Sequence, residues 1–134
     1  MERGKMNIEH NLNTGAISVR IEPMNGTVWM TKYEIARMFD VLVPMVTANL
    51  KVIYSTKELS EVWTVKYLTY TQKNGQVCHT ELYNLDVIIA LAFRMKGGFC
   101  HRFREWIREQ AKRPIVESCR QPIIIQLGKN TFMS

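Results

Sequence analysis

Residues 30–54 read MTKYEIARMFDVLVPMVTANLKVIY and predict two short helices joined by a tight turn. Thr31 and Glu34 have the spacing of a capping box, in which each side chain bonds the backbone N–H of the other residue. The first helix should therefore begin there and end near Asp40. Pro44 suits the first turn of the second helix, where its missing N–H would have no partner anyway. The second helix should bury an apolar face formed by Val46, Leu50 and Ile53.

A pair of helices like this is typical of a helix-turn-helix, whose second helix enters the major groove of DNA. Small Ala36 would allow the two helices to cross closely. The polar candidates for base or phosphate contact are Lys32, Thr47, Asn49 and Lys51. The outward side also carries apolar or small residues, namely Leu42, Val43, Pro44 and Ala48. Two interpretations therefore stay open, a DNA reader and two packed helices without a ligand.

Two β-hairpins are expected on either side of the helix pair. AISVRIE (16–22) alternates as a strand does, and Asn25-Gly26 predicts a tight turn into a second strand at residues 27–29. The later hairpin should span residues 64–83 around Lys73-Asn74-Gly75. Its polar tip, with Lys73 and Asn74, resembles a wing that could lie along a DNA backbone.

Further helices follow the same kind of local signal. Ser55 and Glu58 predict a short helix over residues 56–62. Asn84 should cap a buried helix that runs to Phe93. A last helix is expected over residues 99–112, ended by Arg113-Pro114.

These elements predict an α+β fold, a winged helix-turn-helix-like domain with two β-hairpins and a C-terminal helix pair. That domain should cover residues 1–113, and residues 114–134 should form a tail with one strand, PIIIQL (122–127). An apolar, uncharged strand with a free edge favours aggregation. We hypothesise that it adds to the edge of its own sheet or of a partner's sheet, as a dimerisation arm.

Positive charge is concentrated in the last part of the chain. The net charge is +6; residues 1–93 contain nine basic and nine acidic residues, whereas residues 94–134 contain nine basic and three acidic residues. Such a distribution indicates a polyanionic partner. Candidate phosphate contacts follow one face of the last helix at Arg104, Arg108 and Lys112. The alternative is a solvated face partly paired with Glu105 and Glu109.

Other classes of protein find little support. The three cysteines, Cys78, Cys100 and Cys119, show no CxxC spacing, which favours a reduced, cytoplasmic compartment. The longest apolar run, residues 87–93, is too short to span a bilayer, and residues 1–10 do not resemble a signal peptide. The two Cys-His dipeptides can each supply only one metal ligand, and no catalytic motif is present. We expect no metal, no cofactor and no enzymatic activity.

Several stretches together resemble the RhuM-type virulence-associated family: VWMT (28–31), EIARMF (34–39), LYNLDVIIALAFRMKGG (82–98) and FREWI (103–107). The Phe-Arg-x-Trp helix is also similar to the N-terminal domains of Bro-type phage antirepressors. The resemblance covers about residues 14–112. It implies a DNA-binding domain from a mobile or accessory region of a bacterial genome.

The chain departs from the family where the second helix should read DNA. The usual Ser cap is replaced by Leu42, and two basic positions are occupied by Val43 and Ala48. Pro44, Val46, Thr47, Leu50 and Lys51 still fit the pattern. Either the DNA sequence specificity of the second helix has changed, or this surface binds protein. Clustered apolar surface usually marks a protein contact and would favour the second interpretation.

We therefore expect a cytoplasmic duplex-DNA-binding protein, a transcriptional regulator that acts as a dimer. The second helix would meet the major groove, and the hairpin tip with the Arg104 face would hold the DNA backbone. The alternative is an antirepressor-like or toxin-like protein-interaction module that keeps the fold without reading DNA.

Overall fold

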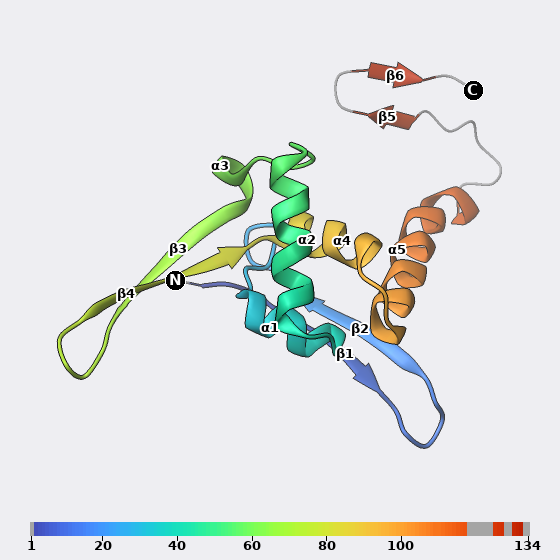
Figure 1. Ribbon diagram of the computed structural model, residues 1–134. Coiled ribbons are helices and arrows are strands. Elements are labelled where there is room, and N and C mark those ends of the chain that lie inside the picture. Colours follow the sequence, from blue (N-terminus) through green and yellow to red (C-terminus); the bar gives the residue numbers. More distant parts are fainter. Residues whose placement is uncertain (1, 118–124, 128–129, 133–134) are drawn as a thin grey trace. The chain divides into compact units, whose positions relative to one another are not determined.

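The computed structural model describes residues 2–117, 125–127 and 130–132, which form a mixed α+β chain (Figure 1). In order, the elements are β1 (Lys5–His10), β2 (Ile17–Glu22), α1 (Lys32–Phe39), α2 (Val43–Ser55), α3 (Glu61–Thr64), β3 (Val65–Thr71), β4 (Val77–Tyr83), α4 (Leu85–Arg94), α5 (Gly98–Glu117), β5 (Ile125–Leu127) and β6 (Asn130–Phe132). The described strands pair in three two-stranded antiparallel sheets, β1–β2, β3–β4 and β5–β6.

The chain divides into two compact units, Met1–Arg104 and Glu105–Ser134. The division falls within α5, earlier in the chain than the expected boundary after residue 113. The first unit contains the helix pair and both long hairpins. The second contains the rest of α5 and the β5–β6 hairpin.

The first hairpin differs from its expected form. β2 pairs with β1, in a register from Lys5 opposite Glu22 to His10 opposite Ile17, and does not pair with residues 27–29. Asn25-Gly26 does form a tight turn, with φ angles of 53° and 79°, but the returning chain bridges back across it only from Thr27 to Met24, and Met30 bridges to Tyr83 of β4 instead. In β1 the apolar Met6 and Ile8 alternate with the polar Lys5, Asn7 and Glu9, a pattern typical of a strand that the sequence prediction overlooked.

The helix pair forms as its local sequence predicts. Thr31 Oγ1 accepts a hydrogen bond from the Glu34 N–H at 3.1 Å, and Glu34 Oε1 accepts one from the Thr31 N–H at 2.9 Å. Asp40 ends α1 in the left-handed conformation, at φ 54°. The chain then turns by 116° into α2, within the range of crossing angles typical of helix-turn-helix motifs. α2 begins at Val43, with Pro44 in its first turn.

The hairpin β3–β4 and the helix α4 also match their expected positions. Gly75 adopts φ 83° at the hairpin tip, where the Gln72 N–H donates to the Gln76 carbonyl at 2.8 Å. The Asn84 side chain accepts a hydrogen bond from the Val87 N–H at 3.3 Å and so caps α4.

Two helix boundaries were wrongly predicted. α2 continues to Ser55, residues 56–60 are not helical, and residues 61–62 belong to α3, a single turn whose N-cap residue Ser60 makes no side-chain capping bond. The helix α5 passes through Pro114 and ends at Glu117. The prediction rested on the rule that proline usually ends or kinks a helix, because it lacks an N–H donor and its ring clashes with the carbonyl four residues earlier.

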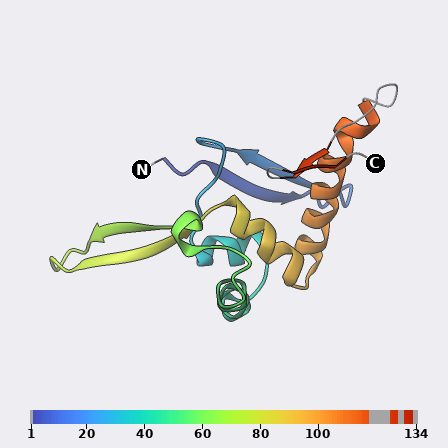
Figure 2. The ribbon, with the colours of Figure 1, turned by 90° about the horizontal axis from the view of Figure 1, so that it is seen from above.

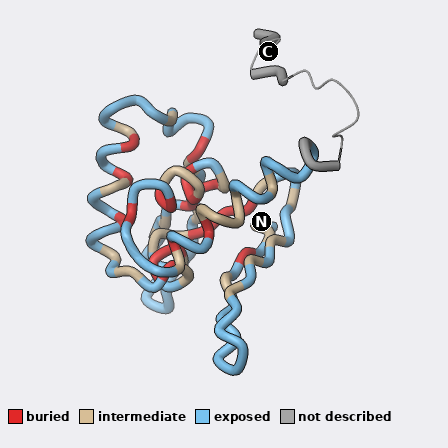
Figure 3. The backbone as a smooth tube through the Cα atoms, turned by 90° about the vertical axis from the view of Figure 1, so that its right-hand side faces the viewer, coloured by how far each residue is buried: buried red, intermediate tan, exposed pale blue. Residues whose placement is uncertain are grey.

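The core of the first unit lies among α1, α2, α4 and the start of α5, while both long hairpins extend into solvent (Figures 2 and 3). The helix α2 is seen end on in Figure 2, with α1 and α4 on one side of it. The Phe39 and Phe103 rings lie 5.6 Å apart, and both side chains are fully buried. The three residues predicted for the core face of α2 are all buried: Val46, Leu50 and Ile53.

Only part of the predicted C-terminal strand, residues 122–127, lies among the described residues. The described end of the predicted strand, Ile125–Leu127, pairs with Asn130–Phe132 of the tail itself. Residues 122–124 lie outside the described residues.

Among the described residues, no single helix is long and apolar enough to cross a membrane. The helices α1 and α2 reach that length and apolar content only as a pair, across their 116° bend.

Candidate nucleic-acid interface

The helix α2 presents a polar flank beside α3. Thr47 and Lys51 are exposed and lie one helical turn apart. Lys51 lines a groove of about 350 Å³ together with Tyr54, Ser55 and Glu61. The predicted contact residues Thr47 and Lys51 are therefore on the accessible surface of the unit, on the flank that meets α3.

One face of the hairpin β3–β4 lies next to the start of α1. The register places Tyr67 opposite Glu81 and Thr69 opposite His79, so these four side chains share one face of the hairpin. A polar cleft of about 210 Å³ separates this face from α1, and its lining includes Lys32, Tyr33, His79 and Glu81. The predicted contact residue Lys32 thus lies beside the hairpin.

A hydrogen bond links α2 to the base of this hairpin. Tyr54 Oη lies 2.9 Å from Thr64 Oγ1, and the buried Thr64 hydroxyl donates to the Ser60 carbonyl at 2.7 Å. Burial raises the pKa of Tyr54, and the nearby charges of Glu61 and Glu81 raise it further, although the Thr64 hydrogen bond opposes the shift. Tyr54 is therefore attached to the base of the hairpin through Thr64.

We call the resulting area the hairpin–α2 surface and define it by Lys32, Thr47, Lys51, Tyr54, Tyr67, His79 and Glu81. Tyr67 is 64% exposed and Tyr33, at the edge of the cleft, is 59% exposed. The sequence analysis did not select Tyr67, His79 or Tyr33. The alternation of β3 and β4 about their Asn-Gly turn would have placed Tyr67 and His79 on one face.

Carboxylates limit the positive potential of this surface. Glu61 shares the groove with Lys51, and Glu81 lies in the cleft with Lys32. Glu81 accepts a hydrogen bond from the Tyr83 hydroxyl. Burial and this hydrogen bond raise the pKa of Tyr83. Two lysines and two carboxylates therefore balance, and any polyanion contact here must be weak.

Two of the predicted contact residues, Asn49 and Asn74, use their side chains in local hydrogen bonds to the backbone. Asn49 Nδ2 donates to the Met45 carbonyl at 2.8 Å, and Asn49 lies on the flank of α2 opposite Thr47 and Lys51. At the hairpin tip, Asn74 Oδ1 accepts a hydrogen bond from the Gln76 N–H at 3.0 Å. Lys73 is exposed beside it.

Arg104 is not presented as the sequence predicted. Its Nη1 atom donates to the Ala92 carbonyl at 2.6 Å and to the Met95 carbonyl at 2.9 Å. The guanidinium thus satisfies carbonyl groups at the end of α4, which have no partner within that helix. Arg108 and Lys112 are exposed positions of α5 in the unit that begins at Glu105.

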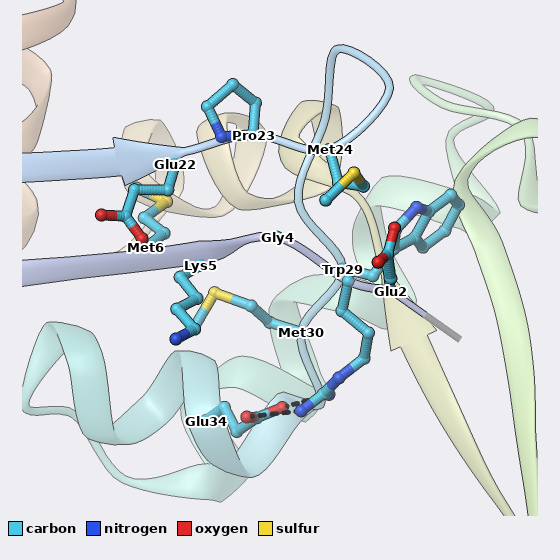
Figure 4. A pocket seen from close by; sticks show the side chains of 11 residues that line it. Glu2, Gly4, Lys5, Met6, Glu22, Pro23, Met24, Trp29, Met30 and Glu34 are labelled. Carbon is cyan, nitrogen blue, oxygen red and sulfur yellow. Dashed lines mark hydrogen bonds and ion pairs between the residues drawn. The ribbon is translucent and has the colours of Figure 1, made fainter.

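A cavity of about 640 Å³ in the first unit contains none of the predicted residues (Figure 4). Its lining includes Met6, Trp29 and Met30, together with Arg3 and Glu34. Two hydrogen bonds of 2.8 and 3.1 Å join the Arg3 guanidinium to the Glu34 carboxylate. Burial opposes the ionisation of Glu34, but these bonds, the Thr31 N–H and the Arg3 charge together lower its pKa. This pair holds the segment before β1 against the start of α1.

Within the part of the chain that the structure describes, no three His, Cys, Asp or Glu side chains converge as metal ligands would.

Comparison with protein-family models, with curated proteins and with solved structures finds no significant match to this chain.

Proposed function

We propose that this protein binds duplex DNA through the hairpin–α2 surface and acts as a transcriptional regulator. The observation that carries the proposal is the placement of Thr47 and Lys51 on the exposed flank of a helix whose other side is core. The 116° turn between α1 and α2 supports it, because a helix-turn-helix needs such a crossing. No family model matches the chain, so the resemblance to the RhuM-type and Bro-type families is itself a proposal.

The dimensions of α2 suit this role. Its 13 residues make a rod about 20 Å long. The major groove, about 12 Å wide, admits an α-helix. Thr47 would meet a base edge, Lys51 and Lys32 would meet phosphates, and Lys73 at the hairpin tip would contact the backbone further along the duplex.

The small number of cations sets the expected strength of binding. Each neutralised phosphate contributes about 0.9 to the slope of log affinity against log salt. Lys32, Lys51 and Lys73 would give the first unit a slope of about −3. The protein should therefore bind random duplex at low salt and release it well before strongly basic DNA-binding proteins do.

Salt-dependent binding of the full chain to a fluorescent random duplex tests the proposal. Lys51→Ala should reduce the slope by about one, and the matched control Lys5→Ala, an exposed lysine on β1, should leave it unchanged. Failure of the unmodified protein to bind at low salt would reject the proposed function.

Exposed apolar residues on α2 favour a second candidate function, a protein-interaction module. The side chain of Leu42 is 76% exposed, and those of Met45 and Val52 are 38% and 41% exposed. Clustered apolar surface usually marks a protein contact. The absence of DNA binding, with the fold intact, would favour this antirepressor-like or toxin-like alternative.

A further inference from the structure

The flank of α2 that faces away from Lys51 carries an uncharged stripe. Met45, Asn49 and Val52 recur at spacings of four and three residues, so their side chains lie along one side of the helix. Leu42, just before the helix, is 76% exposed. Residues 42–50 contain no charged side chain. The stripe borders the buried face formed by Val46, Leu50 and Ile53 without being part of it.

Asn49 stands at the midpoint of α2, with residues 43–48 before it and residues 50–55 after it. A two-fold axis through this midpoint would place Asn49 against Asn49 of a second copy. The same axis would bring Met45 close to Val52 of that copy, because these residues lie nearly equal distances from the midpoint. The helical part of the stripe, Met45, Asn49 and Val52, is therefore complementary to itself, as the contact of a symmetric dimer must be.

The chemistry of Asn49 fits this pairing. One amide hydrogen is used in the bond to the Met45 carbonyl. The second amide hydrogen and the carbonyl oxygen form a donor and an acceptor, the combination that lets two identical amides bond each other. A single asparagine among apolar contact positions is a known means of fixing the register of paired helices.

We propose that the stripe of Leu42, Met45, Asn49 and Val52 is the contact through which two copies of this chain associate. A nucleic acid would need cations here, and the stripe has none. A strongly charged protein partner would likewise find no opposite charge. An uncharged surface that complements itself matches a second copy.

The size of the contact predicts a weak association. A helix of 13 residues, about 20 Å long, packed on its own copy buries less than the roughly 1,200 Å² of a standard interface. The protein should be largely monomeric when dilute and should pair at high concentration. The contact leaves Thr47 and Lys51 free, so it needs no DNA and is compatible with the proposed function.

Disulfide trapping tests this geometry directly. In the full chain with Cys78→Ser and Cys119→Ser, and with the buried Cys100 retained, Asn49→Cys should form a covalent dimer under mild oxidation. Thr47→Cys, at a position on the other flank that is more exposed than Asn49, should nevertheless crosslink at least about tenfold more slowly because it points away from the two-fold axis. Equal crosslinking rates at the two positions would overturn the proposal.

Sedimentation without DNA, up to about 1 mM protein, gives an independent test. Val52→Asp should weaken self-association by at least about tenfold, since two copies would bury opposed carboxylates, and Thr47→Asp should not. A protein that stays monomeric throughout would overturn the contact but leave DNA binding untouched. Self-association without any DNA binding would support the contact and reject the proposed function.

Discussion

The phenol of Tyr54 in α2 and the hydroxyl of Thr64 at the base of the hairpin lie 2.9 Å apart, so one hydrogen bond joins the two elements of the hairpin–α2 surface. Thr64 is 3% exposed, and its hydroxyl also bonds the Ser60 carbonyl. The helix that would enter a groove and the hairpin that would follow the backbone are thus held together through a buried threonine.

Tyr54→Phe removes this link without changing the packing of the ring. We expect the free energy of unfolding to fall by about 1 kcal/mol, the usual net value of one hydrogen bond. Urea unfolding followed by circular dichroism measures it. The control Tyr70→Phe, at a 48% exposed position of β3, should change stability little. Equal changes in the free energy of unfolding for the two variants would show that the Tyr54 hydrogen bond contributes no more to stability than an exposed tyrosine hydroxyl.

Arg104→Ala separates a structural role from DNA contact. The guanidinium bonds two carbonyls at the end of α4, and hydrogen bonds with a charged partner contribute about 1.5–3 kcal/mol. We expect a loss of stability in this range and no change in the salt slope of DNA binding. A smaller salt slope of DNA binding with unchanged stability would show instead that Arg104 contacts DNA phosphates. Lys112→Ala, further along α5, is the comparison for charge alone.

The ion pair between Arg3 and Glu34 should make stability depend on acid pH. Because the pKa of Glu34 is lowered in the folded protein, its ionised form stabilises the fold at pH values above the ordinary value of 4.5. That contribution is lost as the pH falls through the lowered folded value. Glu34→Gln should therefore be less stable than the unmodified protein at pH 7, and the difference should shrink below pH 4.5.

Thermal unfolding at a series of pH values measures this convergence. Glu58→Gln, which breaks the exposed pair with Arg94, is the matched control and should have a smaller effect at pH 7. A stability difference for Glu34→Gln that is constant from pH 7 to about pH 3 would contradict the assignment.

Lys73 at the hairpin tip tests whether the hairpin follows the DNA backbone. Lys73→Ala should weaken binding to all duplexes alike and reduce the salt slope by about one. Fluorescence anisotropy with two unrelated duplexes measures both effects. A loss confined to one of the duplexes would mean that the tip reads bases, and no loss would remove the hairpin tip from the proposed interface.

Local sequence signals determined much of this fold. The Thr31–Glu34 capping box, the Asn74-Gly75 turn and the Asn84 cap each depend on residues within one or two turns of chain, and each formed as expected. The core face of α2 followed from its helical period. Such features can be read from sequence because neighbouring residues decide their free energy.

The pairing of β1 with β2 was missed although its signal is local: Met6 and Ile8 alternate with polar residues and lie opposite Ile21 and Val19 of the next strand. Tertiary structure alone decided the role of Arg104. Arg104 lies on a polar helical face, yet its guanidinium bonds carbonyls that only the packing of α4 brings within reach. The two flanks of α2 also differ in their surroundings. Helical periodicity determines which residues share a side of the helix, whereas tertiary packing determines which elements each side contacts.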